Sequence, residues 1–208
     1  IRQKKLFAEQ TPNWFPIDAS EHKQKDFLGK YLKRQYGSGG YSIYSPNEVS
    51  QNLYNIKGEH NWYAEDICSG LSCSIQVYKG THDEYIVFGF SEQIIEGEKH
   101  FSGARLKRIE FLGPQHRKQL SKIISKCASL LEQYNGFFGI DFIIDTNNEI
   151  QALEMNVRMT AVTIPTLLFN EHHAQEMLFL EDADLHSACG TVLTYSPDGT
   201  GDILKNCL

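Results

Sequence analysis

Residues 136–158 read GFFGIDFIIDTNNEIQALEMNVR, and this stretch decides the fold. Two strand-like runs, Phe138–Asp145 and Glu149–Val157, are separated by Asn147-Asn148, a plausible two-residue turn. We therefore predict an antiparallel hairpin that is centred on this turn.

The predicted hairpin gathers oxygen ligands on one face. Pairing about the turn sets Asp141 opposite Glu154, and Asn156 projects from the same face as Glu154. Two carboxylates about 4 Å apart repel by roughly 4 kcal/mol at an effective dielectric constant of about 20, so a partly buried pair needs a cation. Hard oxygen ligands suit Mg²⁺ or Mn²⁺. The alternative is a solvated sheet face, where the repulsion falls to about 1 kcal/mol. The apolar residues of the first strand belong to the opposite face: Ile140, Phe142 and Ile144.

A glycine loop lies earlier in the chain. Gly37-Ser38-Gly39-Gly40 follows the strand-like segment Tyr31–Tyr36, which contains Lys33. Glycines let backbone N–H groups approach phosphate oxygens, and a nearby lysine adds a point charge. The loop lacks the Lys-Ser/Thr of a P-loop and the third glycine of a dinucleotide fingerprint. We expect a strand–loop–strand flap over phosphates, with a plain hairpin turn as the alternative.

The remaining pattern predicts an α+β protein with antiparallel pieces, divided near Ile67 into lobes at 1–67 and 68–208. Ser45-Pro46-Asn47-Glu48 is typical of a helix start with a capping box, and this helix should reach about Ile56. The basic segment from Lys99 to Arg108 is expected to be a solvated loop at Lys107 and Arg108, whereas Lys99, His100 and Arg105 could equally line the cleft. Other predicted strands are Trp62–Asp66, Ser72–Tyr78 and Tyr85–Phe90. Other predicted helices begin at Pro114, with Gly136 as C-cap, and span Ile164–Leu180.

Composition excludes several function classes. The chain has 208 residues and a net charge of −6, and its 20 Lys and Arg residues are dispersed, which argues against binding to nucleic acid. Its apolar runs are too short to span a membrane. The 5 cysteines show no CxxC spacing, so we expect a reducing cytoplasm rather than a disulfide framework or a zinc site. Because the chain opens with Ile1, we expect it to be a piece of a longer polypeptide.

Taken in order, these segments resemble the ATP-grasp superfamily, and most closely its carboxylate–amine ligases of the D-alanine–D-alanine ligase and pyrrolysine-biosynthesis type. The resemblance covers roughly Lys5 to Thr166 and is strongest for the Asp141-to-Glu154 spacing with the Glu-x-Asn-x-Arg segment that follows. The matching segments are Lys33 with its glycine loop, Tyr63-Ala64-Glu65-Asp66-Ile67, Gly70-Leu71-Ser72-Cys73-Ser74, Gly136–Phe142 and Glu154–Thr160.

The resemblance implies two α+β lobes with antiparallel sheets that enclose a nucleotide cleft. It implies that ATP phosphates meet Lys5, Lys33 and the loop Gly37, Ser38, Gly39 and Gly40. Glu65 would accept from the adenine amino group, and the Ile67 backbone would meet the ring. Asp141, Glu154 and Asn156 would hold two Mg²⁺ ions, and Arg158 would steady the transferred phosphoryl group.

The chain departs from the family pattern at three places. Ser72 stands where the family often has a ribose-binding Glu, and Arg34 stands where it usually has Pro. The N-terminal domain that commonly helps to bind the acceptor is absent from this stretch.

The predicted function is ATP-dependent carbon–nitrogen ligation through an acyl phosphate. Its substrates would be a small carboxylate, such as an amino acid or peptide, and an amine, with no nucleic-acid or membrane partner. One alternative is a phosphotransferase, for which the sequence offers no evident general base. The other is a non-catalytic nucleotide-binding module.

Overall fold

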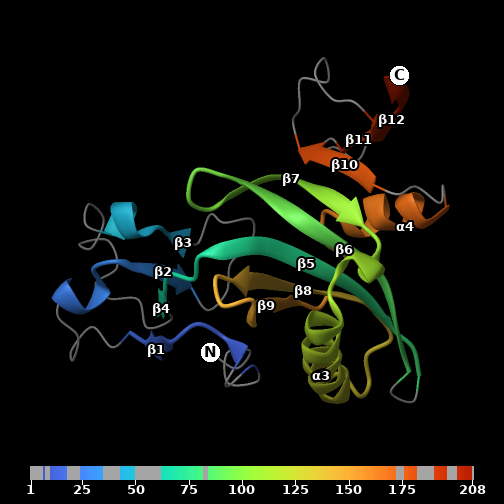
Figure 1. Cartoon of the computed structure of the whole chain (residues 1–208). Helices are drawn as coiled ribbons and strands as arrows, with labels where there is room; N and C mark the ends of the chain where they lie inside the picture. The colour runs from blue at the N-terminus through green and yellow to red at the C-terminus, as the bar shows by residue number, and fades with distance from the viewer. Residues whose placement is uncertain are drawn as a thin grey trace.

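Two sheets organise the computed structural model of the chain (Figure 1). The structure describes residues 7, 10–17, 24–34, 43–49, 62–81, 84–171, 176–181, 190–195 and 201–207. The small sheet has the strand order β1-β4-β2-β3, and the large sheet has the order β12-β11-β10-β7-β6-β5-β8-β9. All pairs are antiparallel except β10 with β11. The α+β class and the antiparallel character of both sheets are confirmed.

The small sheet comes entirely from the first third of the chain. Its strands are β1 (Trp14–Pro16), β2 (Lys30–Arg34), β3 (Ile43–Tyr44) and β4 (Trp62–Asp66), with the 3₁₀ helix η2 (Gln24–Phe27) before β2. The strands of the large sheet are β5 (Gly70–Lys79), β6 (Tyr85–Glu96), β7 (His100–Lys107), β8 (Gly136–Asp145), β9 (Ile150–Asn156), β10 (Glu176–Glu181), β11 (Gly190–Tyr195) and β12 (Gly201–Cys207). The helices beside it are η3 (Ile109–Phe111), α3 (Pro114–Leu130) and α4 (Thr163–Glu171).

The β8–β9 hairpin forms as predicted, but its turn differs. Asn148 has φ 64° and closes a three-residue loop, in which the Asp145 N–H donates to the Glu149 carbonyl at 2.9 Å. This loop shifts the pairing near the turn by one residue, and a β-bulge between Asp141 and Phe142 shifts it back. Asp141 therefore still pairs with Glu154. The predicted two-residue turn is wrong, whereas the predicted pairing of the two acids is confirmed.

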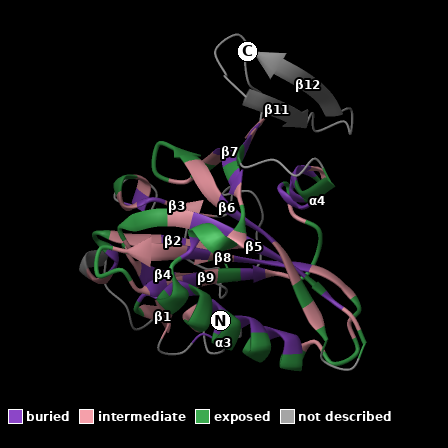
Figure 2. Cartoon of the chain, turned by 45° about the vertical axis from the view of Figure 1, so that its right-hand side comes forward, coloured by how far each residue is buried: buried purple, intermediate pink, exposed green. Residues whose placement is uncertain are grey.

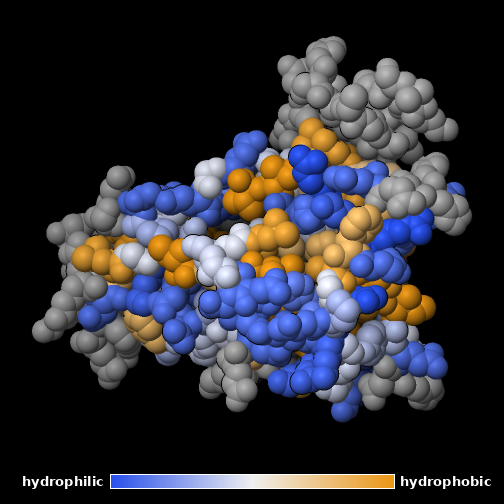
Figure 3. Space-filling model, viewed as in Figure 1, coloured by the Kyte–Doolittle hydropathy of each residue, from blue (hydrophilic) through white to orange (hydrophobic). Residues whose placement is uncertain are grey.

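Helix α3 covers one face of the large sheet. Its apolar side chains at i, i+3 and i+4 spacing are buried against the sheet, while its outer side is hydrophilic (Figures 2 and 3). The helix ends at Leu130, and Gly136, with φ 155°, begins β8 instead of capping the helix. The predicted C-cap is wrong because the chain makes a separate turn over 131–133 before the strand. The buried α3 residues are His116, Leu120, Ile123, Ile124, Cys127 and Ala128.

Helix α4 packs on the opposite face of the large sheet. Ala104 and Leu106 belong to the hydrophobic cluster of α4, and along β7 they alternate with residues that face the α3 side. The predicted helix over Ile164–Leu180 is wrong in its second half, where β10 pairs with β7.

The basic segment also differs from prediction, because most of it is strand β7. Its alternation explains this outcome. Ala104 and Leu106 are fully buried, whereas Arg105 approaches Glu176 at 3.4 Å and Lys107 approaches Glu92 at 2.7 Å. Basic side chains that pair across neighbouring strands are compatible with a central strand, so their charge did not indicate a loop.

The capping box at Ser45 is confirmed within the described residues. The Glu48 N–H donates to Ser45 Oγ at 3.4 Å, and the Ser45 N–H donates to Glu48 Oε2 at 2.8 Å. The predicted continuation of this helix to Ile56 lies outside the described residues. No helix in the described part of the chain is long and apolar enough to cross a membrane.

Lys79 at the end of β5 offers a test of the core. Its side chain is fully buried, and its ammonium donates to the Gly80 carbonyl at the long distance of 3.4 Å. Burying a charge costs free energy that an apolar side chain of similar length avoids. We expect Lys79→Met to raise the free energy of urea unfolding by about 1–3 kcal/mol. The exposed control Lys126→Met should stay within about 0.5 kcal/mol of wild type. A less stable Lys79→Met protein would show that the buried ammonium stabilises the fold.

Candidate active site

A polar strip crosses the α4 side of the large sheet. Asp141 of β8 pairs with Ser74 of β5 and with Glu154 of β9, and the alternation of each strand turns these residues to one face. On the other face, Ile140 and Phe142 are fully buried in the cluster beneath α3. The hairpin therefore has one apolar face in the core and one face that carries carboxylates.

Asp141 is held by several donors. Gln93 Nε2 donates to Asp141 Oδ1 at 3.2 Å, and Asn156 Nδ2 donates to Asp141 Oδ2 at 3.0 Å. Burial raises the pKa of Asp141, while the hydrogen bonds from Ser74, Asn156 and Gln93 and the charge of Arg158 oppose the rise. Burial outweighs these donors, so the position would gain from an added positive charge.

Glu154 and Asn156 complete the predicted donor set. Glu154 is exposed, and Asn156 is half-buried. Because Asn156 Nδ2 faces Asp141, its amide oxygen is turned away from that carboxylate. No three His, Cys, Asp or Glu side chains of the described residues lie together as a metal cluster. Two carboxylates and an amide oxygen are nevertheless hard ligands that suit Mg²⁺, which usually keeps several waters and substrate phosphates as its other ligands. The residues fit such an ion.

Arg158 follows the hairpin on an exposed loop. Its backbone N–H donates to the Asn156 carbonyl at 2.9 Å, and its Nη1 donates to the Met159 carbonyl at 3.1 Å. The guanidinium lies near enough to the strip to act on Asp141 through its charge.

The loop after Arg158 is anchored by a buried amide. Gln76 Oε1 accepts from Thr160 Oγ1 at 3.0 Å and from Thr163 Oγ1 at 2.9 Å, and Gln76 Nε2 donates to Ser74 Oγ at 3.0 Å. This network ties the loop to β5 and thereby fixes where the chain leaves the site. Sequence reasoning missed these residues. The alternation of Ser72, Ser74 and Gln76 along one strand was the available signal for a polar face.

The small sheet contributes a buried ion pair. Lys33 Nζ bonds Glu65 Oε1, and the two side chains are only 16% and 2% exposed. Register sets Lys33 opposite Tyr63 and Tyr31 opposite Glu65, so these side chains share one face. The opposite face, with Leu32 and Ala64 fully buried, forms the core of the small sheet. The structure thus brings two predicted nucleotide-binding residues together.

The charges of acids on both sheets act on Tyr63. Its pKa is raised, first by burial and then by the charges of Glu65 on β4 and Glu154 on β9. The phenol is therefore neutral at physiological pH. The face of the small sheet that carries Lys33 is near the carboxylate strip of the large sheet.

The β6–β7 turn joins the sheets at a second place. Lys99 Nζ donates to the Ile43 carbonyl at 2.6 Å and to Glu48 Oε2 at 2.5 Å, while Tyr31 Oη donates to the Glu98 carbonyl at 2.9 Å. The Lys99 bond is the largest cause of a lowered pKa at Glu48. Lys99 is thus engaged with the small sheet, whereas the sequence left its role open.

The segment between the sheets contains the predicted adenine contact. Ile67 is 52% exposed, and Cys68 is half-buried. An exposed apolar side chain at this point is compatible with stacking on a ring. Strand β5 follows this segment, and Ser72 is its third residue. Ser72 Oγ donates to Gln93 Oε1 at 2.7 Å.

Five of the predicted binding residues lie outside the described residues: Lys5, Gly37, Ser38, Gly39 and Gly40. The roles assigned to them, and those assigned to Lys33, Glu65, Ile67 and Arg158, stay predictions, as do the lobe limits 1–67 and 68–208.

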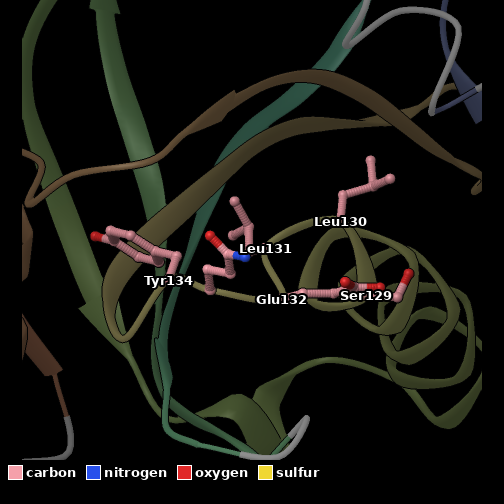
Figure 4. Close-up of a pocket in the computed structure, with 6 residues that line it drawn as sticks. Ser129, Leu130, Leu131, Glu132 and Tyr134 are labelled. Atoms are coloured by element: carbon pink, nitrogen blue, oxygen red, sulfur yellow. The ribbon is translucent and has the colours of Figure 1, made fainter.

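Two surface hollows lie away from the strip. One is at the C-terminal end of α3, where Leu131 and Tyr134 are among the lining residues (Figure 4). The other runs beside α3 and includes Phe7, Gln119 and Gln151. Neither is lined by a residue of the predicted site, so hollow shape alone does not locate it.

Comparison with known proteins decides the family, because residues 3–162 match the sequence model of the ATP-grasp domain. The chain belongs to the ATP-grasp family. No curated protein sequence matches it.

Solved ATP-grasp structures share the fold. The biotin carboxylase domain of Hydrogenobacter thermophilus 2-oxoglutarate carboxylase, in complex with MgADP, ADP and bicarbonate, is 20% identical, with a TM-score of 0.63 over 81% of this chain and 41% of that one. Carboxyaminoimidazole ribonucleotide synthase from Aspergillus clavatus, complexed with ATP, is 15% identical, with a TM-score of 0.59 over 76% of this chain and 44% of that one. L-amino acid ligase from Bacillus licheniformis is 12% identical, with a TM-score of 0.58 over 78% of this chain and 41% of that one. This ATP-grasp chain thus spans less than half the length of each of these proteins.

Substitutions of Lys33 and Glu65 should have strongly non-additive effects on the free energy of unfolding. Removing one partner of a buried ion pair costs about 3–5 kcal/mol, because the other charge stays buried. We therefore expect Lys33→Met to destabilise the protein by roughly 3 kcal/mol, and the double change Lys33→Met with Glu65→Leu to recover most of this loss. Urea unfolding of the four proteins of this double-mutant cycle measures the coupling. Additive effects of the two changes would contradict a paired role.

Proposed function

We propose that this chain is the ATP-binding part of a ligase that activates a carboxylate as an acyl phosphate and joins it to an amine. The observation that carries the proposal is the pairing of Asp141 with Glu154 beside Asn156, on a face that approaches the small sheet of an ATP-grasp fold. The similar structures support the proposal. One is in complex with MgADP, one is in complex with ATP, and one is an L-amino acid ligase.

The residues divide the work between binding and charge stabilisation. Asp141, Glu154 and Asn156 would hold Mg²⁺, which neutralises phosphate charge when bound. Lys33 would present its ammonium to the phosphates, and Glu65 would present its carboxylate to the adenine amino group. These contacts would replace the bond that the two side chains make with each other. Arg158, exposed beside the strip, would steady the phosphoryl group in transfer through its planar guanidinium.

The reaction needs positioning rather than a covalent nucleophile on the protein. A carboxylate oxygen of the substrate attacks the γ-phosphorus, the bond from that phosphorus to the bridging oxygen breaks, and ADP leaves. An amine nitrogen then attacks the acyl carbon, phosphate departs, and the nitrogen loses a proton. The carboxylate is most simply an amino acid or small peptide, as the amino acid ligase among the similar structures suggests. The acceptor side would depend on the rest of a longer protein.

Metal-dependent nucleotide binding is the first test. A non-hydrolysable ATP analogue with Mg²⁺, at about 100 times its dissociation constant, should stabilise the protein by roughly 2.7 kcal/mol and raise Tm by several degrees. Glu154→Ala should abolish the metal-dependent part of this shift, which a thermal melt measures. The control Glu132→Ala changes an exposed acid at the far end of α3 and should behave as wild type. A wild-type protein without any shift would remove the nucleotide site from consideration.

Trapping distinguishes a ligase from a phosphotransferase. Incubation of the full-length protein with ATP, Mg²⁺ and a mixture of the twenty standard amino acids should release ADP, and added hydroxylamine should convert the acyl phosphate to a hydroxamate. Mass spectrometry identifies the hydroxamate and hence the carboxylate. ADP release with a stable phosphate ester and no hydroxamate would instead indicate phosphoryl transfer to a hydroxyl group.

A further inference from the structure

A chain of hydrogen bonds crosses four strands of the large sheet. Ser72 Oγ on β5 donates to Gln93 Oε1 on β6 at 2.7 Å, and Gln93 Nε2 donates to Asp141 Oδ1 on β8 at 3.2 Å. From the other side, Asn156 Nδ2 on β9 donates to Asp141 Oδ2 at 3.0 Å. Each oxygen of the Asp141 carboxylate therefore has an amide donor from a different strand.

The direction of the chain is set at Asp141. A carboxamide has one accepting and one donating end, and an ionised carboxylate only accepts, so Gln93 turns Nε2 toward Asp141 and Oε1 toward Ser72, whose hydroxyl donates to it. Without that hydroxyl, Gln93 Oε1 would lose the donor that holds this end of the side chain. Ser72 thus anchors the amide that donates to Asp141.

Gln93 reaches this position across an intervening strand. Strand β5 lies between β6 and β8, so the backbones of β6 and β8 are about 10 Å apart, and the Gln93 side chain, the hydrogen bond and the Asp141 side chain together bridge this gap. Ser74, the β5 residue opposite both Asp141 and Ser91, is small enough to let it pass. Gln93 is only half-buried and does not belong to the hydrophobic clusters, so its placement contributes little packing.

We propose that Gln93 is a positioning residue for the carboxylate of Asp141, and that Ser72 acts through Gln93 instead of contacting the nucleotide. This inference rests on the proposed function, because it assumes that Asp141 binds a divalent cation. With one lone-pair direction of each oxygen taken by an amide, and a further hydrogen bond from Ser74, the carboxylate is held in one rotation and presents what remains of its lone-pair surface to the ion. Outer residues that orient metal ligands in this way typically change metal affinity about 10–100-fold when they are removed.

The proposal also gives Ser72 a role that suits its size. The Ser72 side chain is short, and its hydroxyl points along the sheet to Gln93. The Ser72–Gln93 pair is neutral, so it adds no formal charge beside Asp141 and Glu154.

Four variants test the inference, with the full-length protein and a non-hydrolysable ATP analogue. Gln93→Met keeps the length of the side chain and removes both hydrogen bonds. Ser72→Ala removes the hydroxyl, and Ser72→Thr restores it. The control Gln151→Met removes a similar bond on the same hairpin, from Gln151 Nε2 to Asp145 Oδ2 at 3.1 Å, near the turn.

Two readouts are needed for each variant. One is the free Mg²⁺ concentration that gives half of the nucleotide-dependent thermal shift, and the other is the affinity for the analogue without metal. We expect the half-saturating Mg²⁺ concentration to rise about 10-fold or more in Gln93→Met and by a smaller factor in Ser72→Ala. Ser72→Thr and Gln151→Met should match wild type. The metal-free affinity and the metal-free Tm should be unchanged throughout.

The possible failures are distinguishable. If wild type responds to Mg²⁺ and Gln93→Met responds at the same concentration, the positioning role is wrong and the proposed function stands. If Ser72→Ala matches wild type while Gln93→Met is impaired, the role of Ser72 is wrong. A parallel loss of metal-free affinity and Tm in Gln93→Met would show a structural role and overturn the inference. A wild type without any Mg²⁺ response overturns the proposed function itself.

Discussion

The pairing of Asp141 with Glu154 is the constraint on which the rest of the structure depends. Two acids can face each other on a hairpin only if the opposite face gains enough from burial to hold the register. Here that face packs under α3, and a bulge after Asp141 corrects the shift that the three-residue turn introduces. A slip of one residue would turn Asp141 into the core and Phe142 out of it, so the packing of α3 indirectly places the proposed metal ligands.

The two sheets handle buried charge in different ways. The small sheet neutralises Glu65 internally with Lys33, whereas the large sheet surrounds Asp141 with neutral donors and leaves its pKa raised by burial. In the small sheet the balancing charge comes from within the fold. At Asp141 the charge of Arg158 opposes the rise of the pKa without cancelling it, which suits a site that is proposed to receive Mg²⁺ together with a polyphosphate.

Much of the candidate site could be predicted from the local sequence pattern, because its residues are close in sequence. The spacing of Asp141, Glu154 and Asn156 within one hairpin indicated their shared face, and the family match over residues 3–162 supports the fold that this segment suggested. The errors arose where a local signal had two structural uses. Gly136 looked like a helix cap but begins β8 with a positive φ, and the charges of β7 looked like a solvated loop but pair across strands.

By itself, the sequence determined the α+β class, the hairpin and the ligand types, since strand alternation and capping chemistry act over a few residues. Only the tertiary structure decided which distant groups meet. The Ser72–Gln93–Asp141 chain joins residues on three strands, and Lys33 reaches Glu65 across 32 positions of the chain. Such contacts depend on strand order and on the bulge that restores register. Neither is encoded in the spacing of the residues involved, because both result from packing the sheets and helices together.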